Sequence, residues 1–307
     1  MKQLIFWGTP AFAVPPLREL HDCGLIRCVI TQPDKPQGRG QSQLPPSPVK
    51  EAATNLNLPV LQPSQFDASF EAALGEFLPA TFLVVAYGKL IPNAVLMRSA
   101  LPAINIHPSL LPELRGPSPI QTALLRGDRL TGLTLMQLDE ELDHGSILAQ
   151  KKVSIAPTDT YLTLSEKLSL SATQFVRTYV PAYLHGELKP VQQDHSHATF
   201  SKKIETKDTE LRLEKTADEL LNMIRAFNPK PGTFLVIGGK RFKIMSARRY
   251  TAPPVPAATL FRSEHGYLGI VCDPEKREAI EVILIQPEGR PAMNAMDFLN
   301  GYSGILG

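Results

Sequence analysis

Residues 4–23 read LIFWGTPAFAVPPLRELHDC, a short apolar run followed by a glycine turn and a helical pattern that opens with prolines. The run Leu4–Trp7 contains no polar residue, as is typical of a strand that is buried on both faces of a sheet. Such a strand, passing directly into a helix, predicts an α/β fold with a parallel sheet.

The same alternation continues to about residue 156. Further strands are expected at Cys28–Thr31, Phe82–Ala86, Ala103–Ile106, Gly132–Leu138 and Ile147–Ile155. Helices are expected at Pro10–Cys23, Pro48–Leu56, Pro117–Leu125 and Thr160–His185, the last burying Leu162, Leu164, Leu168, Leu170, Phe175 and Tyr179. The pattern predicts one domain over residues 1–188, with an open parallel sheet that is covered by helices.

The composition then changes. Residues 189–210 are polar and lack apolar periodicity, which predicts a linker or a strap across the surface. A helix is expected at Thr216–Phe227, opened by a capping box between Thr216 and Glu219. Short strands are expected at Thr233–Ile237, Arg241–Ala247, Ala257–Phe261, Tyr267–Val271 and Ile280–Ile285. Five strands spaced by turns predict a small barrel over residues 211–307.

The composition limits the class of protein. The 307 residues carry 32 basic and 30 acidic side chains, and 43% of them are hydrophobic. This balance excludes a disordered chain and a chain that is strongly basic throughout. The longest apolar runs are too short to span a membrane, so we expect a soluble, cytoplasmic protein. Three cysteines without a CxxC pair indicate neither a disulfide framework nor a zinc site, and we expect no metal.

The first turn bears on the choice of cofactor. Gly8-Thr9-Pro10 lies where a dinucleotide fold has its phosphate-binding loop, but Pro10 and Ala13 stand where G-x-G-x-x-G requires glycine. An NAD enzyme is therefore disfavoured, and Gly8 is expected only to make a tight turn.

The candidate chemistry follows the strand Ala103–Ile106. Asn105 and His107 are two residues apart, so in an extended segment their side chains point the same way. In an open α/β sheet, ligands bind at the carboxyl ends of strands. An amide that stabilises an oxyanion beside an imidazole that moves protons suits acyl transfer.

Asp143, in the acidic stretch Asp139–Asp143, is the third candidate. It would lie at the same sheet edge if the strand Gly132–Leu138 runs parallel to Ala103–Ile106, and it could then orient His107 or take a proton through water. Alone, this histidine would more often be structural and the acidic stretch a solvated loop. The longer string that includes Pro112–Pro117 favours a catalytic role.

That string carries a resemblance. NIHPSLLPELRGPSPIQ (105–121) and TGLTLMQLDEELDHGSIL (131–148) resemble the folate-dependent formyltransferases. Further matching stretches span nearly the whole chain: FWGTPAFAVPPL (6–17), TQPDKPQGRG (31–40), PSPVK (46–50), VVAYGKLIP (84–92), AFNPKPG (226–232) and QPEGRPAM (286–293).

The resemblance implies a Rossmann-like domain that binds 10-formyltetrahydrofolate, followed by an OB-like barrel that binds tRNA. The formyl group would pass from N10 of the folate to the amino group of methionine on initiator tRNA. The family's triad falls on Asn105, His107 and Asp143. The folate site would be formed by Ser109, Leu110, Leu111, Pro112, Tyr87, Gly88, Ile91 and Pro92. The resemblance also favours a monomer.

The residue chemistry agrees with this. Attack of an amine on a formyl carbon creates an oxyanion, which Asn105 and protonated His107 could stabilise. Whether His107, Asp143 or a water first deprotonates the methionyl ammonium is left open by the sequence.

Two regions are expected to touch RNA. The long loop Gln32–Pro48 would meet the acceptor end, although Gln41-Ser42-Gln43 stand where the family commonly has lysines after GRG. Residues 225–263 contain eight basic and no acidic side chains, which suits backbone binding. The expected contacts are Lys35, Arg39, Lys202, Lys203, Arg225, Lys240, Arg241, Lys243, Arg248 and Arg249. Other departures from the family pattern are His144, Ser146 and Lys230; His144 is expected to be an exposed loop residue.

Two rival interpretations remain. A purine-precursor or sugar-nucleotide formyltransferase would share the Asn105, His107 and Asp143 core, but the purine enzyme lacks the extra residues after about 200. A non-enzymatic RNA-binding module would leave that core unexplained. The identity of the formyl acceptor separates the three.

Overall fold

The computed structural model describes residues 3–34, 45–273, 275–302, 304 and 306. The chain divides into two compact units. The first comprises Met1–Gly116, Leu130–Ser154 and Ser165–Phe200, and the second comprises Pro117–Arg129, Ile155–Leu164 and Ser201–Gly307.

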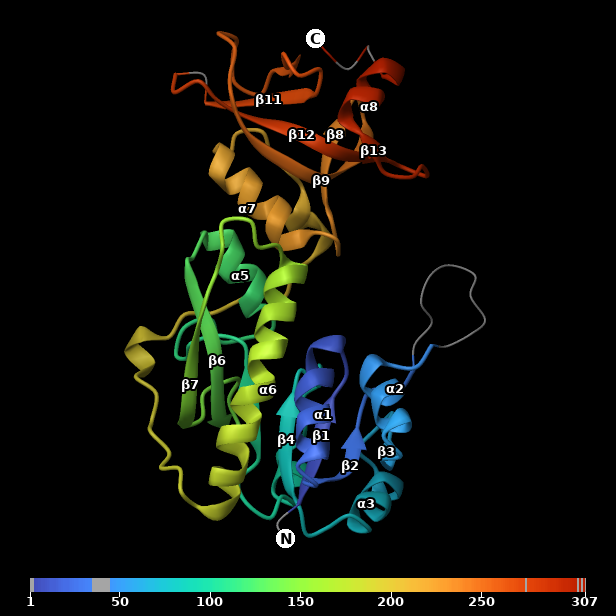
Figure 1. Cartoon of the computed structure of the whole chain (residues 1–307), viewed down its shortest axis with the longest axis vertical. Coiled ribbons are helices and arrows are strands. Elements are labelled where there is room, and N and C mark those ends of the chain that lie inside the picture. The colour runs from blue at the N-terminus through green and yellow to red at the C-terminus, as the bar shows by residue number, and fades with distance from the viewer. Residues whose placement is uncertain (1–2, 35–44, 274, 303, 305, 307) are drawn as a thin grey trace. The chain divides into compact units, whose positions relative to one another are not determined.

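The first unit is built on a seven-stranded sheet in the order β3-β2-β1-β4-β5-β6-β7 (Figure 1). Its strands are β1 (Leu4–Gly8), β2 (Ile26–Ile30), β3 (Val60–Leu61), β4 (Thr81–Val85), β5 (Ile104–His107), β6 (Leu130–Gln137) and β7 (Ile147–Ser154). The first five strands in this order are parallel. The predicted Rossmann-like, mostly parallel sheet is confirmed.

β6 runs against this direction. It is antiparallel to β5, with Ile104 opposite Gln137 and His107 opposite Thr134, and β7 returns antiparallel to β6. A parallel orientation of β6, on which the expected position of Asp143 depended, is therefore wrong. The loop after β6 starts beside the beginning of β5, where Leu138 N donates to Ala103 O at 2.7 Å.

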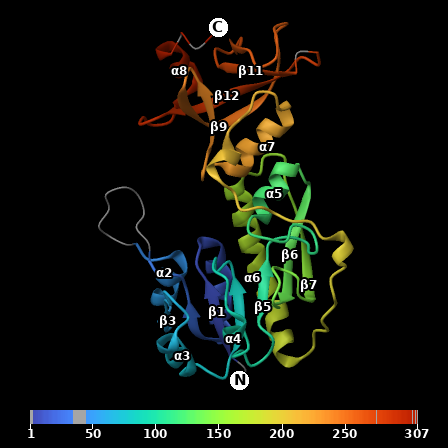
Figure 2. The ribbon, with the colours of Figure 1, turned by 180° about the vertical axis from the view of Figure 1, so that it is seen from behind.

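Helices pack around this sheet (Figure 2). They are η1 (Ala11–Ala13), α1 (Val14–Asp22), α2 (Pro48–Asn55), α3 (Ala68–Gly75) and α4 (Asn93–Leu96), together with α6 (Tyr161–His185), which belongs to the first unit from Ser165 onward. A further turn, η2 (His195–His197), lies in the strap after α6. Ser47 caps α2 by accepting from Lys50 N at 3.1 Å, and Pro48 occupies the first turn, where its missing N–H costs nothing.

The buried face of α6 differs from the expected one. Leu164, Leu168 and Phe175 are buried, but Leu162 is 58% exposed and Leu170 is 60% exposed. The helix instead buries Ala172, Val176, Val180, Tyr183 and Leu184. Leu162 and Leu170 fall outside this stripe because they are out of phase with the i, i+4 series that starts at Leu164.

Gly8 ends β1 and its backbone is not left-handed. A Cβ at this position would lie 2.8 Å from Phe6 Cε1 and 3.0 Å from Val85 O. Close packing, rather than the expected turn geometry, therefore requires glycine here.

The second unit contains a curled antiparallel sheet in the order β10-β11-β12-β9-β8, with β13 paired to β12. Its strands are β8 (Thr233–Ile237), β9 (Lys240–Thr251), β10 (Leu260–Arg262), β11 (Leu268–Asp273), β12 (Glu278–Pro287) and β13 (Met293–Asn294). Its helices are α5 (Pro119–Arg126), η3 (Thr206–Thr209), α7 (Ala217–Phe227) and α8 (Ala295–Gly301). The predicted capping box is present, with Thr216 as the N-cap and Glu219 at N3. α7 packs against α5 and β9.

Across the residues that the structure describes, no helix is both long enough and apolar enough to cross a lipid bilayer.

Candidate active site

β5 carries the two polar side chains that the spacing predicted. Asn105 is 9% exposed and His107 is 4% exposed, and they share a face of the strand because they are two residues apart. β4 pairs in parallel with β5, with Val84 opposite Asn105, so the turn after β4 begins at the same sheet edge as the segment after β5. The strand ends therefore form the edge at which such sheets bind ligands.

The two ring nitrogens of His107 have different surroundings. Nε2 lies 2.9 Å from Leu114 O, and since a carbonyl only accepts, Nε2–H is the donor. Nδ1 faces Asp143 Oδ2 at 3.5 Å, longer than a direct hydrogen bond. Nδ1 is therefore the ring atom through which a proton can pass to or from a substrate, a water or the carboxylate.

Asp143 reaches His107 although β6 is antiparallel. Its backbone is left-handed, with φ of 52°, and its Oδ2 accepts from Gly116 N at 2.8 Å. Two residues later, a Cβ at Gly145 would lie only 2.0 Å from Gln137 O, so this loop is pressed onto the end of β6. The loop folds back across the sheet and brings the carboxylate to the histidine from a direction that the sequence did not predict.

Asn105 completes the group. Its amide is nearly buried, and among the described residues it has no hydrogen-bond partner. Its N–H groups thus remain available to an oxygen of a substrate. In the same described part of the chain, no three His, Cys, Asp or Glu side chains are grouped in a way that could hold a metal ion.

The segment after β5, which is predicted to line the folate site, is fixed by hydrogen bonds to its own turn, to β6 and to Thr199. Ser109 is 1% exposed, and its hydroxyl donates to Glu113 O at 2.6 Å. Leu111 N donates to Thr134 Oγ1 at 3.1 Å, and Thr199 N donates to Pro112 O at 3.3 Å. The Ser109 hydroxyl therefore shapes its own turn, while Leu110 and Pro112 remain partly exposed.

In the turn after β4, the aromatic ring points into the core. Tyr87 is 1% exposed, its ring packs edge-on against Trp7 at 5.2 Å, and burial raises the pKa of its hydroxyl to about 12. Gly88 has φ of 81°, and a Cβ there would lie 2.7 Å from Gln32 Nε2. Ile91 is buried in the same core, whereas Pro92 is exposed at the start of α4.

Arg115 and Gln193 form a buried polar pair next to this site, and the sequence did not predict their contact. Arg115 is 4% exposed and Gln193 is 5% exposed. Arg115 lies in the motif of residues 112–117, and Gln193 lies in the polar stretch of residues 189–210. Neither residue type nor spacing indicated that the two side chains meet.

Some expected RNA contacts are solvent-accessible and others are not. Lys35 and Arg39 lie outside the described residues. Lys202 and Lys203 are exposed. Arg225 is half-buried and donates to Asp159 O at 3.1 Å and to Asn222 Oδ1 at 2.5 Å, and burial lowers its pKa.

The basic stretch 225–263 is partly neutralised by acidic side chains from elsewhere in the sequence. Arg248 binds Glu281 at 2.5 Å, and Arg249 pairs with Asp218 and with Glu278. Glu281 is fully buried, which opposes its ionisation, but hydrogen bonds from Ser263, Arg248 and His265 outweigh burial and lower its pKa. The absence of acidic residues from this window therefore overstates its free positive charge.

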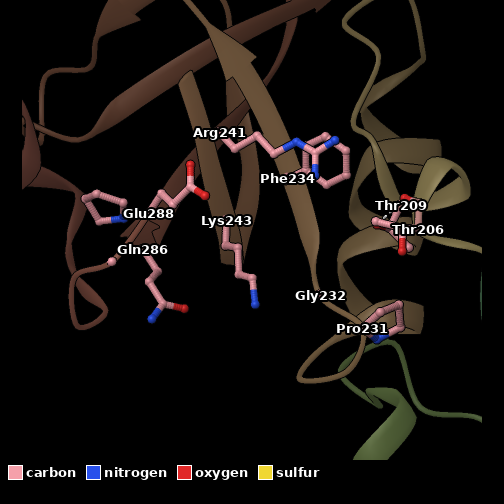
Figure 3. A pocket seen from close by; sticks show the side chains of 11 residues that line it. Thr206, Thr209, Pro231, Gly232, Phe234, Arg241, Lys243, Gln286 and Glu288 are labelled. Atoms are coloured by element: carbon pink, nitrogen blue, oxygen red, sulfur yellow. Dashed lines mark hydrogen bonds between the residues drawn. The ribbon is translucent and has the colours of Figure 1, made fainter. Parts of the chain in front are cut away.

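Two further cations of β9, Arg241 and Lys243, border a pocket of about 290 Å³ in the second unit (Figure 3). The Arg241 guanidinium lies over the Phe234 ring at 4.5 Å from its centroid, and Lys243 projects from the same strand. Thr206 and Thr209 line one side of the pocket, and Gln286 and Glu288 line the other, where Glu288 adds one negative charge. This rim is positively charged on balance.

Comparisons with known proteins identify the family of the chain. Residues 1–179 match the formyl transferase family, and residues 203–303 match the formyl transferase C-terminal domain. The chain is 39% identical to methionyl-tRNA formyltransferase of Myxococcus xanthus, over 98% of this chain and 95% of that protein. It is 38% identical to the enzyme of the same name from Geobacillus thermodenitrificans, over 100% and 96%.

A solved structure supports the fold. An N-formyltransferase from Helicobacter canadensis superposes with a TM-score of 0.69 at 18% identity, covering 92% of this chain and 99% of that one.

Proposed function

The chain belongs to the formyl transferase family, and from this premise we propose that it transfers the formyl group of 10-formyltetrahydrofolate to the amino group of methionine on initiator tRNA. The product, N-formylmethionyl-tRNA, serves the initiation of translation. One observation carries the proposal. His107 Nδ1 lies 3.5 Å from Asp143 Oδ2, and Asn105 shares the strand β5 with His107.

The methionyl ammonium first loses one proton, to Asp143 or to a water, because its nitrogen has no free lone pair until then. The amine then forms a bond to the formyl carbon, and negative charge develops on the formyl oxygen. Asn105 donates an amide N–H to that oxygen, and the Nδ1–H of protonated His107 does the same. Both groups are buried, so the charge is stabilised where little water competes.

Collapse of the tetrahedral adduct breaks the bond between the formyl carbon and N10. The methionyl ammonium gives up two protons overall: one ends on N10, and the other leaves to solvent. His107 Nδ1 passes its proton toward N10 and regains one from the attacking nitrogen, directly or through a water. Asp143 orients the ring and releases to solvent the first proton taken from the ammonium. Since Leu114 O engages Nε2, the ring need not turn during the cycle.

The surroundings fit a folate and an RNA. Leu110 and Pro112 offer partly exposed apolar surface in the segment that follows β5, against which a flat ring can pack. Lys202, Lys203, Lys240, Arg241 and Lys243 offer positive charge in the second unit. We also propose, from the resemblance to the family, that the protein acts as a monomer in the cytoplasm, where initiator tRNA is used.

The test supplies 10-formyltetrahydrofolate with methionylated initiator tRNA, glycinamide ribonucleotide or an amino-sugar nucleotide. We expect formyl incorporation into the tRNA alone. Asn105→Ala or His107→Ala should lower the single-turnover rate by about 10²–10³-fold, the usual cost of removing such a donor, while the variants still fold and unfold cooperatively on heating. The exposed residues Asn55 and His185 provide matched controls as Asn55→Ala and His185→Ala. Near-normal turnover in either site variant would contradict the assignment.

A further inference from the structure

A buried hydrogen-bond network joins the strap after α6 to the backbone on both sides of His144. We propose that Gln193 and Arg115 are positioning residues for formyl transfer, which hold the backbone of Asp143 so that its carboxylate faces His107. This inference rests on the proposed function and deepens it.

Gln193 uses its whole hydrogen-bonding capacity. Its Nε2 donates to Asp143 O at 2.9 Å and to Gly145 O at 2.8 Å. Its Oε1 accepts from Arg115 Nε at 3.1 Å and from Nη2 at 2.7 Å. A side-chain amide offers two donors and one oxygen with two lone pairs, and all four are engaged here.

Arg115 fixes the orientation of that amide. A guanidinium only donates, so the amide oxygen must face Arg115 and the amide nitrogen must face the two loop carbonyls. In a reversed amide, the NH2 group would face the Arg115 N–H donors, and the amide oxygen would face the two loop carbonyls. Arg115 N is itself held by Thr199 O at 2.9 Å, and the next residue, Gly116, donates to Asp143 Oδ2. One backbone segment therefore supports the carboxylate directly and, through Gln193, the backbone behind it.

Two histidines extend the network to the surface. Arg115 Nη2 donates to His195 Nδ1 at 2.8 Å. The His195 ring stacks on His144 with 4.1 Å between centroids and 3° between planes, and His144 Nδ1 lies 2.7 Å from Asp139 Oδ2. His144 was singled out as a departure from the family pattern and expected to be merely exposed; it is instead a partner of the strap.

Asp143 needs external support because its local geometry is unfavourable. A left-handed backbone is uncommon for residues other than glycine, and such strain persists only where surrounding contacts impose it. The loop also approaches His107 from the far end of β6, so β-sheet pairing alone does not position the carboxylate. Gln193 supplies two of the contacts that do.

The test compares Gln193→Glu with Gln192→Glu. Glutamate at 193 is nearly isosteric and keeps both acceptors for Arg115, but it cannot donate to Asp143 O and Gly145 O. Gln192 is the exposed neighbour on the same strap, so its variant makes the same charge change outside the network. We expect Gln193→Glu to lower kcat by about 10- to 100-fold with little change in the KM for the folate, as misplacement of a catalytic group does. Gln192→Glu should behave as the wild type.

Both variants are then combined with Asp143→Asn. If Gln193 acts through the carboxylate, Gln193→Glu should cost less than about 2-fold in that background, because residues that act as a unit are not additive. An equal loss in both backgrounds would overturn the positioning role. A wild-type chain that formylates no tRNA would instead overturn the proposed function, so the two failures are distinguishable.

His195→Phe provides a second variant at an exposed residue. Phenylalanine keeps a ring for His144 to stack on but offers no acceptor to Arg115 Nη2. We expect a loss of about 3-fold in kcat, the effect of one modest hydrogen bond, and no loss in the Asp143→Asn background. Wild-type kcat in both Gln193→Glu and His195→Phe would also overturn the inference.

Discussion

Thr134 lies opposite His107 on β6 and is fully buried. Its single hydroxyl donates to Ser109 O at 2.7 Å and accepts from Leu111 N at 3.1 Å and Gln150 Nε2 at 3.0 Å. Gln150 also donates to Leu111 O at 2.8 Å. The segment that we assign to folate binding is thus tied to the sheet mainly through one threonine.

Thr134→Val tests this link. Valine has nearly the same shape but leaves Leu111 N and Ser109 O without their partner. We expect a loss of about 1–3 kcal/mol in the free energy of unfolding, the cost of leaving buried polar groups unsatisfied. Because the loosened segment is assigned to folate binding and not to the chemistry, KM for the folate should rise more than kcat falls. Urea denaturation and steady-state kinetics measure the two effects.

Thr131 provides the control on the same strand. It is 3% exposed, and in the described structure its hydroxyl has no hydrogen-bond partner. Thr131→Val should therefore be neutral or stabilising, with unchanged KM. Equal effects of the two substitutions would show that Thr134 has no special role.

The sequence predicted those site residues whose positions follow from one strand. Asn105 and His107 needed only a β-strand and a two-residue spacing. Gln193 could not be predicted, because its partners Asp143 and Arg115 are distant in sequence and meet it only in the folded unit. Ser109 and Tyr87 show a further limit: the resemblance placed them at the folate site but did not reveal that their side chains face inward.

At the scale of elements, long apolar runs were located within one or two residues, as for β1 and β5. An apolar run does not show whether its strand pairs in parallel or antiparallel with its neighbour. The orientation of β6 relative to β5 could therefore not be predicted from the sequence. β3 and α4 were missed because a two-residue strand or a four-residue helix is too short to show a period. α3 is as long as α2 but was missed because its apolar residues do not gather on one face.

The start of α7 was predictable because capping is a local pattern. Thr216 Oγ1 accepts from Glu219 N at 3.2 Å, and Glu219 Oε2 accepts from Thr216 N at 2.9 Å. The Thr216 backbone N–H, Lys215 and the Thr216 hydroxyl together lower the pKa of Glu219 to about 2. The ionised carboxylate also interacts favourably with the positive end of the helix dipole.

Glu219→Gln should keep the capping geometry and remove the charge. The pKa of Glu219 is lower in the folded chain than in the unfolded one, so its charge stabilises the folded state fully above about pH 4.5. This contribution is lost as the pH falls from there toward 2. The wild type should therefore exceed Glu219→Gln in stability at pH 7, and the difference should shrink below about pH 4.5. Tm measured across this range tests the sign; a difference that grows on acidification would contradict it.

At the scale of the whole chain, the near-zero net charge conceals an uneven distribution. Residues 1–189 hold 16 basic and 16 acidic side chains, so the excess of two lies in the rest of the chain. The linear run of cations did not reveal that Arg248 and Arg249 are neutralised by carboxylates that folding brings to them. In the described part of the chain, Lys240 and Lys243 have no carboxylate within ion-pair distance.

This difference predicts which cations bind RNA phosphates. A lysine on a phosphate releases a counterion, so Lys240→Gln and Lys243→Gln should each reduce the slope of log K for tRNA against log salt by about 1. Arg249→Gln should leave the slope unchanged and lower Tm instead, because Asp218 and Glu278 lose their partner. Lys276→Gln, at an exposed lysine paired with Asp273, should change neither quantity. Binding measured at several salt concentrations tests this, and a slope that falls for Arg249→Gln but not for Lys243→Gln would place the RNA on a different face of the second unit.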